Sequence, residues 1–208
     1  MITLDVATGA RGLTTLLGRA VGLDEQTCAR IQEVGDGALD VFVTTPFDAI
    51  ASRRITGTVS RNTATVGARD LLEALQSGAR EIGPARDASW PGALPPAGGF
   101  VAREEVPVGV ARRLADQGRN LARQFSGPAG PPKSLLDGTV LTADADSADP
   151  VEIPMRMIFA CTALGLIPGF EAPAEIPRHM RVATCGRWTR LDAPFGSVYR
   201  NTGLGLLF

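Results

Sequence analysis

Hydrophobic residues recur along residues 8–23 with the spacing of an amphipathic helix. At about 100° per residue, the apolar side chains of this stretch gather on one side. They are Leu13, Leu16, Leu17, Ala20 and Val21. Residues 29–34 and 38–45 follow on either side of a Gly-Asp-Gly turn, with hydrophobic and polar positions that favour two antiparallel strands. The pattern therefore predicts a helix followed by a β-hairpin.

The next hydrophobic segments predict a third strand and a second helix. Residues 53–59 have the composition of a strand, and residues 63–66 form a short strand candidate that runs directly into a helical pattern. Gly78 follows the last periodic residue, where a glycine commonly ends a helix. The first part of the chain is thus expected to mix helices with antiparallel strands.

The composition changes between Gly83 and Gly99, where four prolines and four glycines interrupt any periodicity. Such a stretch is typical of a linker or a long surface loop. We therefore expect an N-terminal half over residues 1–82, a linker or loop over 83–99 and a C-terminal half over 100–208. Trp90 in this stretch either pins the loop onto the core or stands at the mouth of a ligand site.

The clearest helical pattern in the chain covers residues 107–125, and Pro107 suits its first turn. Ala111, Leu114 and Leu121 are expected on the buried side. Beyond it, residues 139–144 are a strand candidate, residues 153–168 read as a buried helix, and short strands within 181–200 are joined by a turn. Three arginines lie within about 40° of one another on the side of the 107–125 helix that is opposite its apolar side. They are Arg112, Arg119 and Arg123.

Two stretches echo each other at a separation of 87 residues, namely 65–72 and 152–159. Each has a strand-like residue, a Gly or Pro, any residue, an Arg and then an apolar helix. The halves are therefore either copies of one unit, or they share a junction that many strand-turn-helix segments resemble. The fold class predicted is α+β, an antiparallel sheet with packed helices, with the option of two similar α+β halves.

The order of these elements resembles the repeated unit of DNA sliding clamps. A helix, then antiparallel strands, then a strand leading into a helix occurs twice, most clearly over residues 3–78. The resemblance rests on this topology rather than on a diagnostic motif. It implies repeated α+β units.

Composition places the chain among ordinary folded proteins. Apolar residues make up 44% and charged residues 21% of the 208 positions, which favours a real core. The opening residues lack the charged and apolar regions of a secretory signal, so a cytoplasmic location and no membrane association are expected. The odd number of widely spaced cysteines, Cys28, Cys161 and Cys185, points to reduced thiols.

Common catalytic and metal-binding motifs are absent from the sequence. His179 is the sole histidine and is expected to lie in a surface loop. Asp144, Asp146 and Asp149 resemble the start of a calcium loop but lack its glycine and distal glutamate, so a solvated turn is expected. We expect no metal and no cofactor. Whether the protein is an enzyme stays open at this point.

Positive charge is concentrated near the C-terminus, because residues 176–208 hold five arginines and a single acid, Asp192. Arginines interleaved with aromatic residues can bind an anionic partner by ion pairing and stacking. The predicted anion-binding residues are Arg187, Arg190, Arg200, Arg181, Arg112, Arg119 and Arg123, with Trp188, Tyr199 and Trp90 as aromatic contacts. The alternative is that these arginines pair with acids elsewhere in the chain and the aromatics fill the core.

Two functional hypotheses follow. The first is a non-catalytic binding protein for an anionic partner, either nucleic acid or an acidic protein. The second is an enzyme or sensor for a small anionic metabolite, with arginine clamps and the Trp90 loop as a lid. A homodimer is left open by the sequence.

The last six residues, Gly203–Phe208, allow two interpretations. They resemble the short peptide by which bacterial replication and repair proteins bind the sliding clamp, with Gly203 in place of its glutamine. The alternative is a terminal strand of the sheet.

Overall fold

A computed structural model describes residues 1–125, 132–169 and 171–202. The chain divides into two compact units, Met1–Ala97 and Gly98–Gly205, called unit 1 and unit 2 below. The residues Gly203–Phe208, with both interpretations proposed for them, lie outside the described part. None of the helices in the described ranges is long and apolar enough to cross a membrane.

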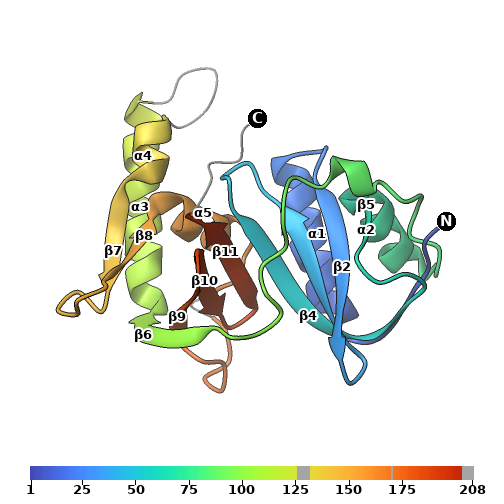
Figure 1. Cartoon of the computed structure of the whole chain (residues 1–208). Coiled ribbons are helices and arrows are strands. Elements are labelled where there is room, and N and C mark those ends of the chain that lie inside the picture. Colours follow the sequence, from blue (N-terminus) through green and yellow to red (C-terminus); the bar gives the residue numbers. More distant parts are fainter. Residues whose placement is uncertain (126–131, 170, 203–208) are drawn as a thin grey trace. The chain divides into compact units, whose positions relative to one another are not determined.

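Unit 1 is an antiparallel sheet with two helices (Figure 1). Its strands follow the spatial order β5-β2-β3-β4-β1. In chain order the elements are β1 (Leu4–Thr8), α1 (Ala10–Leu23), β2 (Cys28–Gly35), β3 (Ala38–Thr44), β4 (Ile50–Val59), β5 (Ala64–Gly67), α2 (Ala68–Ser77) and the 3₁₀ turn η1 (Asp87–Ser89).

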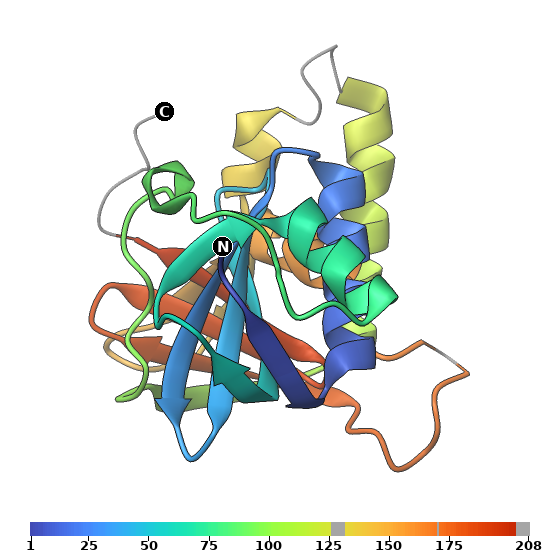
Figure 2. The same ribbon diagram turned by 90° about the vertical axis from the view of Figure 1, so that its right-hand side faces the viewer.

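The local sequence of unit 1 explains these elements. The buried residues of α1 are the five that the periodicity placed on one side. The β2–β3 turn has positive φ at Asp36 (51°) and Gly37 (69°), as the two central residues of a type I′ hairpin require. Gly78 ends α2 in the left-handed conformation, with φ of 72°. Figure 2 shows α1 and α2 side by side against one face of the sheet.

The strands of unit 2 pair in the antiparallel order β11-β10-β9-β6, and β7 and β8 form a hairpin of their own. Its elements are β6 (Val101–Pro107), α3 (Val108–Phe125), α4 (Lys133–Asp137), β7 (Thr139–Ala143), β8 (Val151–Pro154), α5 (Met155–Ala163), β9 (His179–Cys185), β10 (Trp188–Ala193) and β11 (Gly196–Asn201). The α+β class with an antiparallel sheet is therefore confirmed.

The same order of elements occurs in both units. A strand, a helix and three antiparallel strands form β1-α1-β2-β3-β4 in unit 1 and β8-α5-β9-β10-β11 in unit 2. A strand that leads directly into a helix pairs with the first of those three strands in each unit, β5 with β2 and β6 with β9. Both echoing sequence stretches are strand-to-helix junctions, β5-α2 and β8-α5. In the order of elements, however, β8-α5 of unit 2 corresponds to β1-α1 of unit 1 and not to β5-α2.

Two details differ from the expected helices of unit 2. The segment expected as a buried helix over 153–168 begins as strand β8, and its helix α5 covers only Met155–Ala163. Leu121 of α3, expected in the core, is 43% exposed. Among the α3 side chains that the structure describes, the buried residues are small. They are Val108, Ala111, Ala115 and Gly118.

Gly118 allows α3 to lie close against α5. A Cβ atom at this position would lie 2.7 Å from Cε of Met155 and 2.8 Å from Cζ of Phe159. Both distances are shorter than van der Waals contact. The absence of a side chain at residue 118 therefore sets how closely the two helices pack.

We predict that Gly118→Val destabilises the protein by about 1–3 kcal/mol, because the added atoms overpack the α3–α5 contact. The matched control is Gly18→Val in α1, where a Cβ atom would have no neighbour within 4 Å. Its effect should stay within about 0.5 kcal/mol, since valine and glycine differ little in a solvent-exposed helix position. Urea denaturation of both variants measures the difference. Equal stability of the two variants would contradict the packing argument.

Candidate anion-binding surfaces

Strand register places four of the predicted residues on one face of the unit 2 sheet. Arg190 lies opposite Tyr199, Asp192 lies opposite Ser197 and Arg181, and Trp188 is two residues from Arg190 on the same strand. The other face carries Met180, which contacts Cys161 of α5 at 4.0 Å between the sulfur atoms. The face with Arg181, Trp188, Arg190 and Tyr199 is therefore the one away from α5, and it is called the outer face of unit 2.

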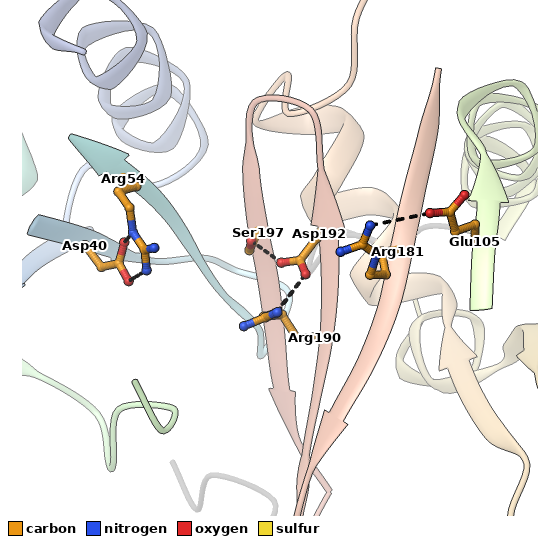
Figure 3. Close-up of polar contacts among 7 residues, drawn as sticks. All are labelled: Asp40, Arg54, Glu105, Arg181, Arg190, Asp192 and Ser197. Atoms are coloured by element: carbon orange, nitrogen blue, oxygen red, sulfur yellow. Dashed lines mark hydrogen bonds and ion pairs between the residues drawn. The ribbon is translucent and has the colours of Figure 1, made fainter. Parts of the chain in front are cut away.

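The arginines of this outer face are already ion-paired (Figure 3). Nη2 of Arg190 lies 2.8 Å from Oδ2 of Asp192, whose other oxygen accepts a 2.6 Å hydrogen bond from Ser197. Arg181 lies 3.5 Å from Glu105 of β6. Intramolecular carboxylates therefore balance both guanidinium groups.

The aromatic residues of the outer face pack against one another and against arginine. The guanidinium carbon of Arg190 lies 4.2 Å from the ring centroid of Phe100. Phe100 in turn meets Tyr199 edge to face, with 6.0 Å between centroids. Tyr199 is only 6% exposed, so its ring belongs largely to the core, whereas Trp188 is half-buried. Phe100 was not among the predicted aromatic contacts.

Arg200 and Arg187 do not join this cluster. Arg200 pairs in register with Thr189, on the other face from Arg190, and lies 3.8 Å from Asp137 of α4. Asp137 also forms an ion pair with Arg156, a buried residue of α5, whose Nη2 lies 2.5 Å from Oδ1 of Asp137. Arg187 is an exposed residue of the turn between β9 and β10. The predicted arginines of the C-terminal stretch are thus divided between two faces and a turn.

The arginines of α3 form a surface separate from the outer face, because α3 packs on α5 and α5 packs on the opposite face of the sheet. Arg119 and Arg123 are exposed and Arg112 is half-buried. Asp116 is the one acidic residue of the helix and lies 2.6 Å from Arg119. Four arginines to one aspartate leave α3 with a net positive solvent side.

Besides Arg69 of α2, which pairs with Glu25, the prediction missed three exposed arginines on helices α1 and α3. Arg113 stands next to Arg112 in α3, and Arg11 and Arg19 lie on the solvent side of α1. Helix α1 has no acidic residue. The signal was present in the sequence, since Arg11 and Arg19 are eight residues apart on the polar side of the helix that the hydrophobic pattern had already defined.

Trp90 lies in unit 1 and is 7% exposed, which makes it a buried residue. The guanidinium carbon of Arg30 lies 5.9 Å from its ring centroid. Asp87 holds this segment, because its carboxylate accepts hydrogen bonds from the Thr65 N–H at 2.9 Å and from Arg61 at 2.6 Å. The Thr65 N–H is the largest cause that lowers the pKa of Asp87, and Arg61 adds to it.

The histidine and the aspartates of the polar turn, which were weighed as catalytic or metal-binding residues, contact charged residues of the same unit. His179 begins strand β9 rather than lying in a loop, and its Nε2 is 3.9 Å from Glu105. Arg103 pairs with Asp144 and Asp149 of the polar turn, at 3.5 Å and 2.9 Å. Within residues 1–125, 132–169 and 171–202, no group of three or more His, Cys, Asp or Glu residues could hold a metal ion.

The three cysteines are free thiols in different environments. Burial raises the pKa of Cys161 to about 12. Burial also raises the pKa of Cys28, against an opposing effect of Arg86. Cys185 is half-buried and its Sγ lies 3.8 Å from the carbonyl oxygen of Gly98.

Comparison with known proteins places the chain in a family. The model of a family described as a domain of unknown function (DUF8185) matches residues 95–205. The chain belongs to the DUF8185 family. A second family model, a domain of unknown function (DUF8010), matches residues 1–92 of this DUF8185 protein. No curated protein matches it.

Several solved structures that share this fold are bacterial sliding clamps. The DNA polymerase sliding clamp of Caulobacter crescentus is 12% identical and has a TM-score of 0.61, over 97% of the DUF8185 protein and 65% of the clamp. The Pseudomonas aeruginosa clamp is 12% identical, with a TM-score of 0.58, over 97% and 64% of the two chains. A putative DNA polymerase III beta subunit from Eubacterium rectale is 10% identical, with a TM-score of 0.59, over 100% and 66%.

These matches confirm the resemblance to sliding clamps at the level of the fold. The DUF8185 protein spans less than two thirds of the length of the clamps it matches.

We predict that thiol reagents label Cys185 of the native DUF8185 protein first and Cys161 last. The raised pKa of Cys161 leaves little thiolate, and its burial blocks access. Mass spectrometry of peptides after a timed treatment with iodoacetamide measures the order, and Cys185→Ser provides the control. Rapid labelling of Cys161 without denaturant would contradict its burial.

We also predict that Asp87→Asn exposes Trp90. The carboxylate is favoured in the fold because its pKa is lowered, so its contribution is present at neutral pH and is lost as pH falls below the ordinary value of 3.8. In a Trp188→Phe background, acrylamide should quench Trp90 more strongly in the Asp87→Asn variant at neutral pH. Asp5→Asn, which breaks an exposed ion pair with Arg80, is the control. Identical quenching in all three proteins would refute this role of Asp87.

Proposed function

We propose that this protein is a non-catalytic binding protein that contacts an anionic polymer, with duplex DNA as the first candidate, through the arginines of α3 and α1. The observation that carries the proposal is the distribution of charge. Exposed positive charge gathers on two helices, whereas the arginines predicted on the outer face of unit 2 are neutralised within the chain.

Each of the two helices, taken by itself within its own unit, has the composition of a phosphate-contacting surface. Helix α3 carries Arg112, Arg113, Arg119 and Arg123 against Asp116, and α1 carries Arg11 and Arg19 against no acid. By contrast, α2 carries Arg69 against Asp70 and Glu73. Arginine side chains on one side of a helix can contact successive phosphates, and this contact does not depend on base sequence.

The sheet arginines are weaker candidates, because a carboxylate matches each of them, whereas α3 has one aspartate for four arginines. In unit 1 the Nε and Nη2 of Arg54 donate to both oxygens of Asp40, at 2.8 Å and 2.7 Å (Figure 3). In unit 2, Arg190 and Arg181 have the partners Asp192 and Glu105. An internal carboxylate competes with any incoming anion, and the C-terminal arginines are divided between two faces and a turn. Arg187, Arg190, Arg200 and Arg181 therefore take a secondary place in the proposal.

The fold supports nucleic acid over an acidic protein as the partner. The solved structures that match the chain are DNA polymerase sliding clamps, and they share its fold at 10–14% identity. The activity of those proteins is carried over only as a hypothesis. An acidic protein partner, a homodimer and a cytoplasmic location likewise stay predictions.

The proposal predicts that the protein binds a duplex DNA of about 20 base pairs at about 50 mM salt and that the affinity falls steeply as salt is raised. Arg119→Gln with Arg123→Gln should weaken binding and lower the slope of log K against log salt by about two, since each lost phosphate contact removes about one unit. Fluorescence anisotropy with labelled DNA measures both quantities.

The matched control is Arg69→Gln with Arg80→Gln. It removes the same charge from two exposed arginines outside α1 and α3, each in a surface ion pair with a unit 1 acid. Its slope should stay close to that of the wild type. If no duplex binding occurs at low salt, or if both double variants lose affinity equally, the helix surface is not the binding site.

A further inference from the structure

Five buried side-chain polar atoms of unit 1 have no hydrogen-bond partner among the described residues, and one of them, Oδ2 of Asp70, lies 3.4 Å from Arg86 in an ion pair. The other four belong to strands β2 and β5 and to Trp90. They are Nε of Arg30, Oε1 of Gln32, Oγ1 of Thr65 and Nε1 of Trp90. Thr65 is fully buried and Trp90 nearly so. Buried polar atoms are nearly always hydrogen-bonded in folded proteins, because an unpaired one loses its hydration without compensation. Four such atoms in one region call for an explanation.

The four side chains belong to one cluster. Arg30 and Gln32 are two residues apart on β2, so they share a face of the sheet. Thr65 lies directly opposite Arg30 on β5, and the Trp90 ring lies 5.9 Å from the Arg30 guanidinium carbon. Ile31, between Arg30 and Gln32, points to the opposite face and is fully buried. We call these four residues the Trp90 cluster.

Arg30 has no carboxylate within ion-pairing distance in the described part of the chain, which sets it apart from Arg54 on the same face. Asp40 lies opposite Gln32 on β3, but both of its oxygens are held by Arg54. Asp87 is an acid that interacts with this region, since Arg30 contributes to the lowering of its pKa. Its oxygens are held by Thr65 and Arg61. A half-buried arginine with an unused N–H is suited to an anionic ligand.

A short strap of chain, residues 84–90, carries Trp90 over the cluster. Its residues 84–89 are exposed, and it is flanked by Gly83 and Gly92, with φ of 105° and 86°. Two hydrogen bonds tie it to β5, from Thr65 N–H to Asp87 and from Arg86 N–H to the Thr65 carbonyl at 2.8 Å. Two ion pairs also hold it, Asp87 with Arg61 at 2.6 Å and Arg86 with Asp70 at 3.4 Å. The glycines at both ends allow the segment to open once these contacts are released.

We propose that the Trp90 cluster binds a small carboxylate that also carries a hydroxyl group, and that the strap opens to admit it. The N–H groups of Arg30 and Trp90 donate to the carboxylate oxygens. The carbonyl oxygen of Gln32 accepts from the ligand hydroxyl, and the Thr65 hydroxyl adds a further donor or acceptor. This assignment satisfies all four buried atoms with one compact ligand. It is independent of the DNA-binding proposal, which involves other residues.

The experiment uses the full chain with Trp188→Phe, so that Trp90 is the single tryptophan. Glycolate is the probe, and acetate, ethylene glycol and inorganic phosphate are the comparisons. Glycolate should change Trp90 fluorescence and raise the melting temperature in a saturable manner. Its affinity should exceed that of acetate by about tenfold, the effect of one additional hydrogen bond in a buried site.

Thr65→Val tests the cluster without removing volume. Because Oγ1 has no partner in the described chain, the variant should melt at the same temperature as its parent without ligand, and it should bind glycolate about tenfold more weakly. The matched control is Thr189→Val, a buried threonine of β10, which should leave glycolate affinity unchanged. Trp90→Phe, read by melting temperature, should weaken glycolate binding as Thr65→Val does, because it removes the N–H donor and keeps an aromatic ring.

Three results would overturn the proposal. The first is the lack of any saturable response to glycolate. The second is equal binding of phosphate or acetate, which would exclude recognition of the hydroxyl group. The third is a lower melting temperature of Thr65→Val without ligand, which would mean that Oγ1 already has a partner and serves only the fold.

Discussion

Helices that pack on one face of an antiparallel sheet are the constraint on which both units depend. In unit 2, Gly118 of α3 lies against Met155 and Phe159 of α5, where a Cβ atom would lie closer than van der Waals contact. The helices cover one face of the sheet, as the contact between Cys161 of α5 and Met180 of β9 illustrates. Polar and charged residues are then left to the other face and to the solvent side of the helices. The two candidate surfaces of the protein arise from this separation.

Local patterns were sufficient to predict much of the fold. The buried side of α1, the β2–β3 hairpin and the end of α2 at Gly78 all follow from periodicity and turn chemistry over short distances. The buried side of α3 was harder, because its contacts are made by alanines and a glycine rather than by large residues. Leu121 had the hydrophobicity of a core residue, but only the partner helix determines which side is covered.

The candidate site was less accessible to sequence reasoning, because charge balance is decided in space. The C-terminal stretch is strongly basic in sequence, but Arg181 forms an ion pair with Glu105, 76 residues earlier, and Arg200 lies near Asp137. Strand alternation also sends Arg190 and Arg200 to opposite faces. Helical spacing alone placed Arg119 and Arg123 on the solvent side of α3, where the structure has them. The unpaired atoms around Trp90 were invisible in the sequence, since they depend on which strands become neighbours.

The glycine at position 118 also has a consequence for how this protein can diverge. A larger residue there displaces the ends of the Met155 and Phe159 side chains, so a smaller residue on α5 favours the change. A chimera that takes α3 from a distant homologue and keeps α5 would inherit a mismatched pair, even if each helix is sound by itself. Recombination in unit 2 should therefore preserve the span from residue 108 to residue 163 as one inherited block.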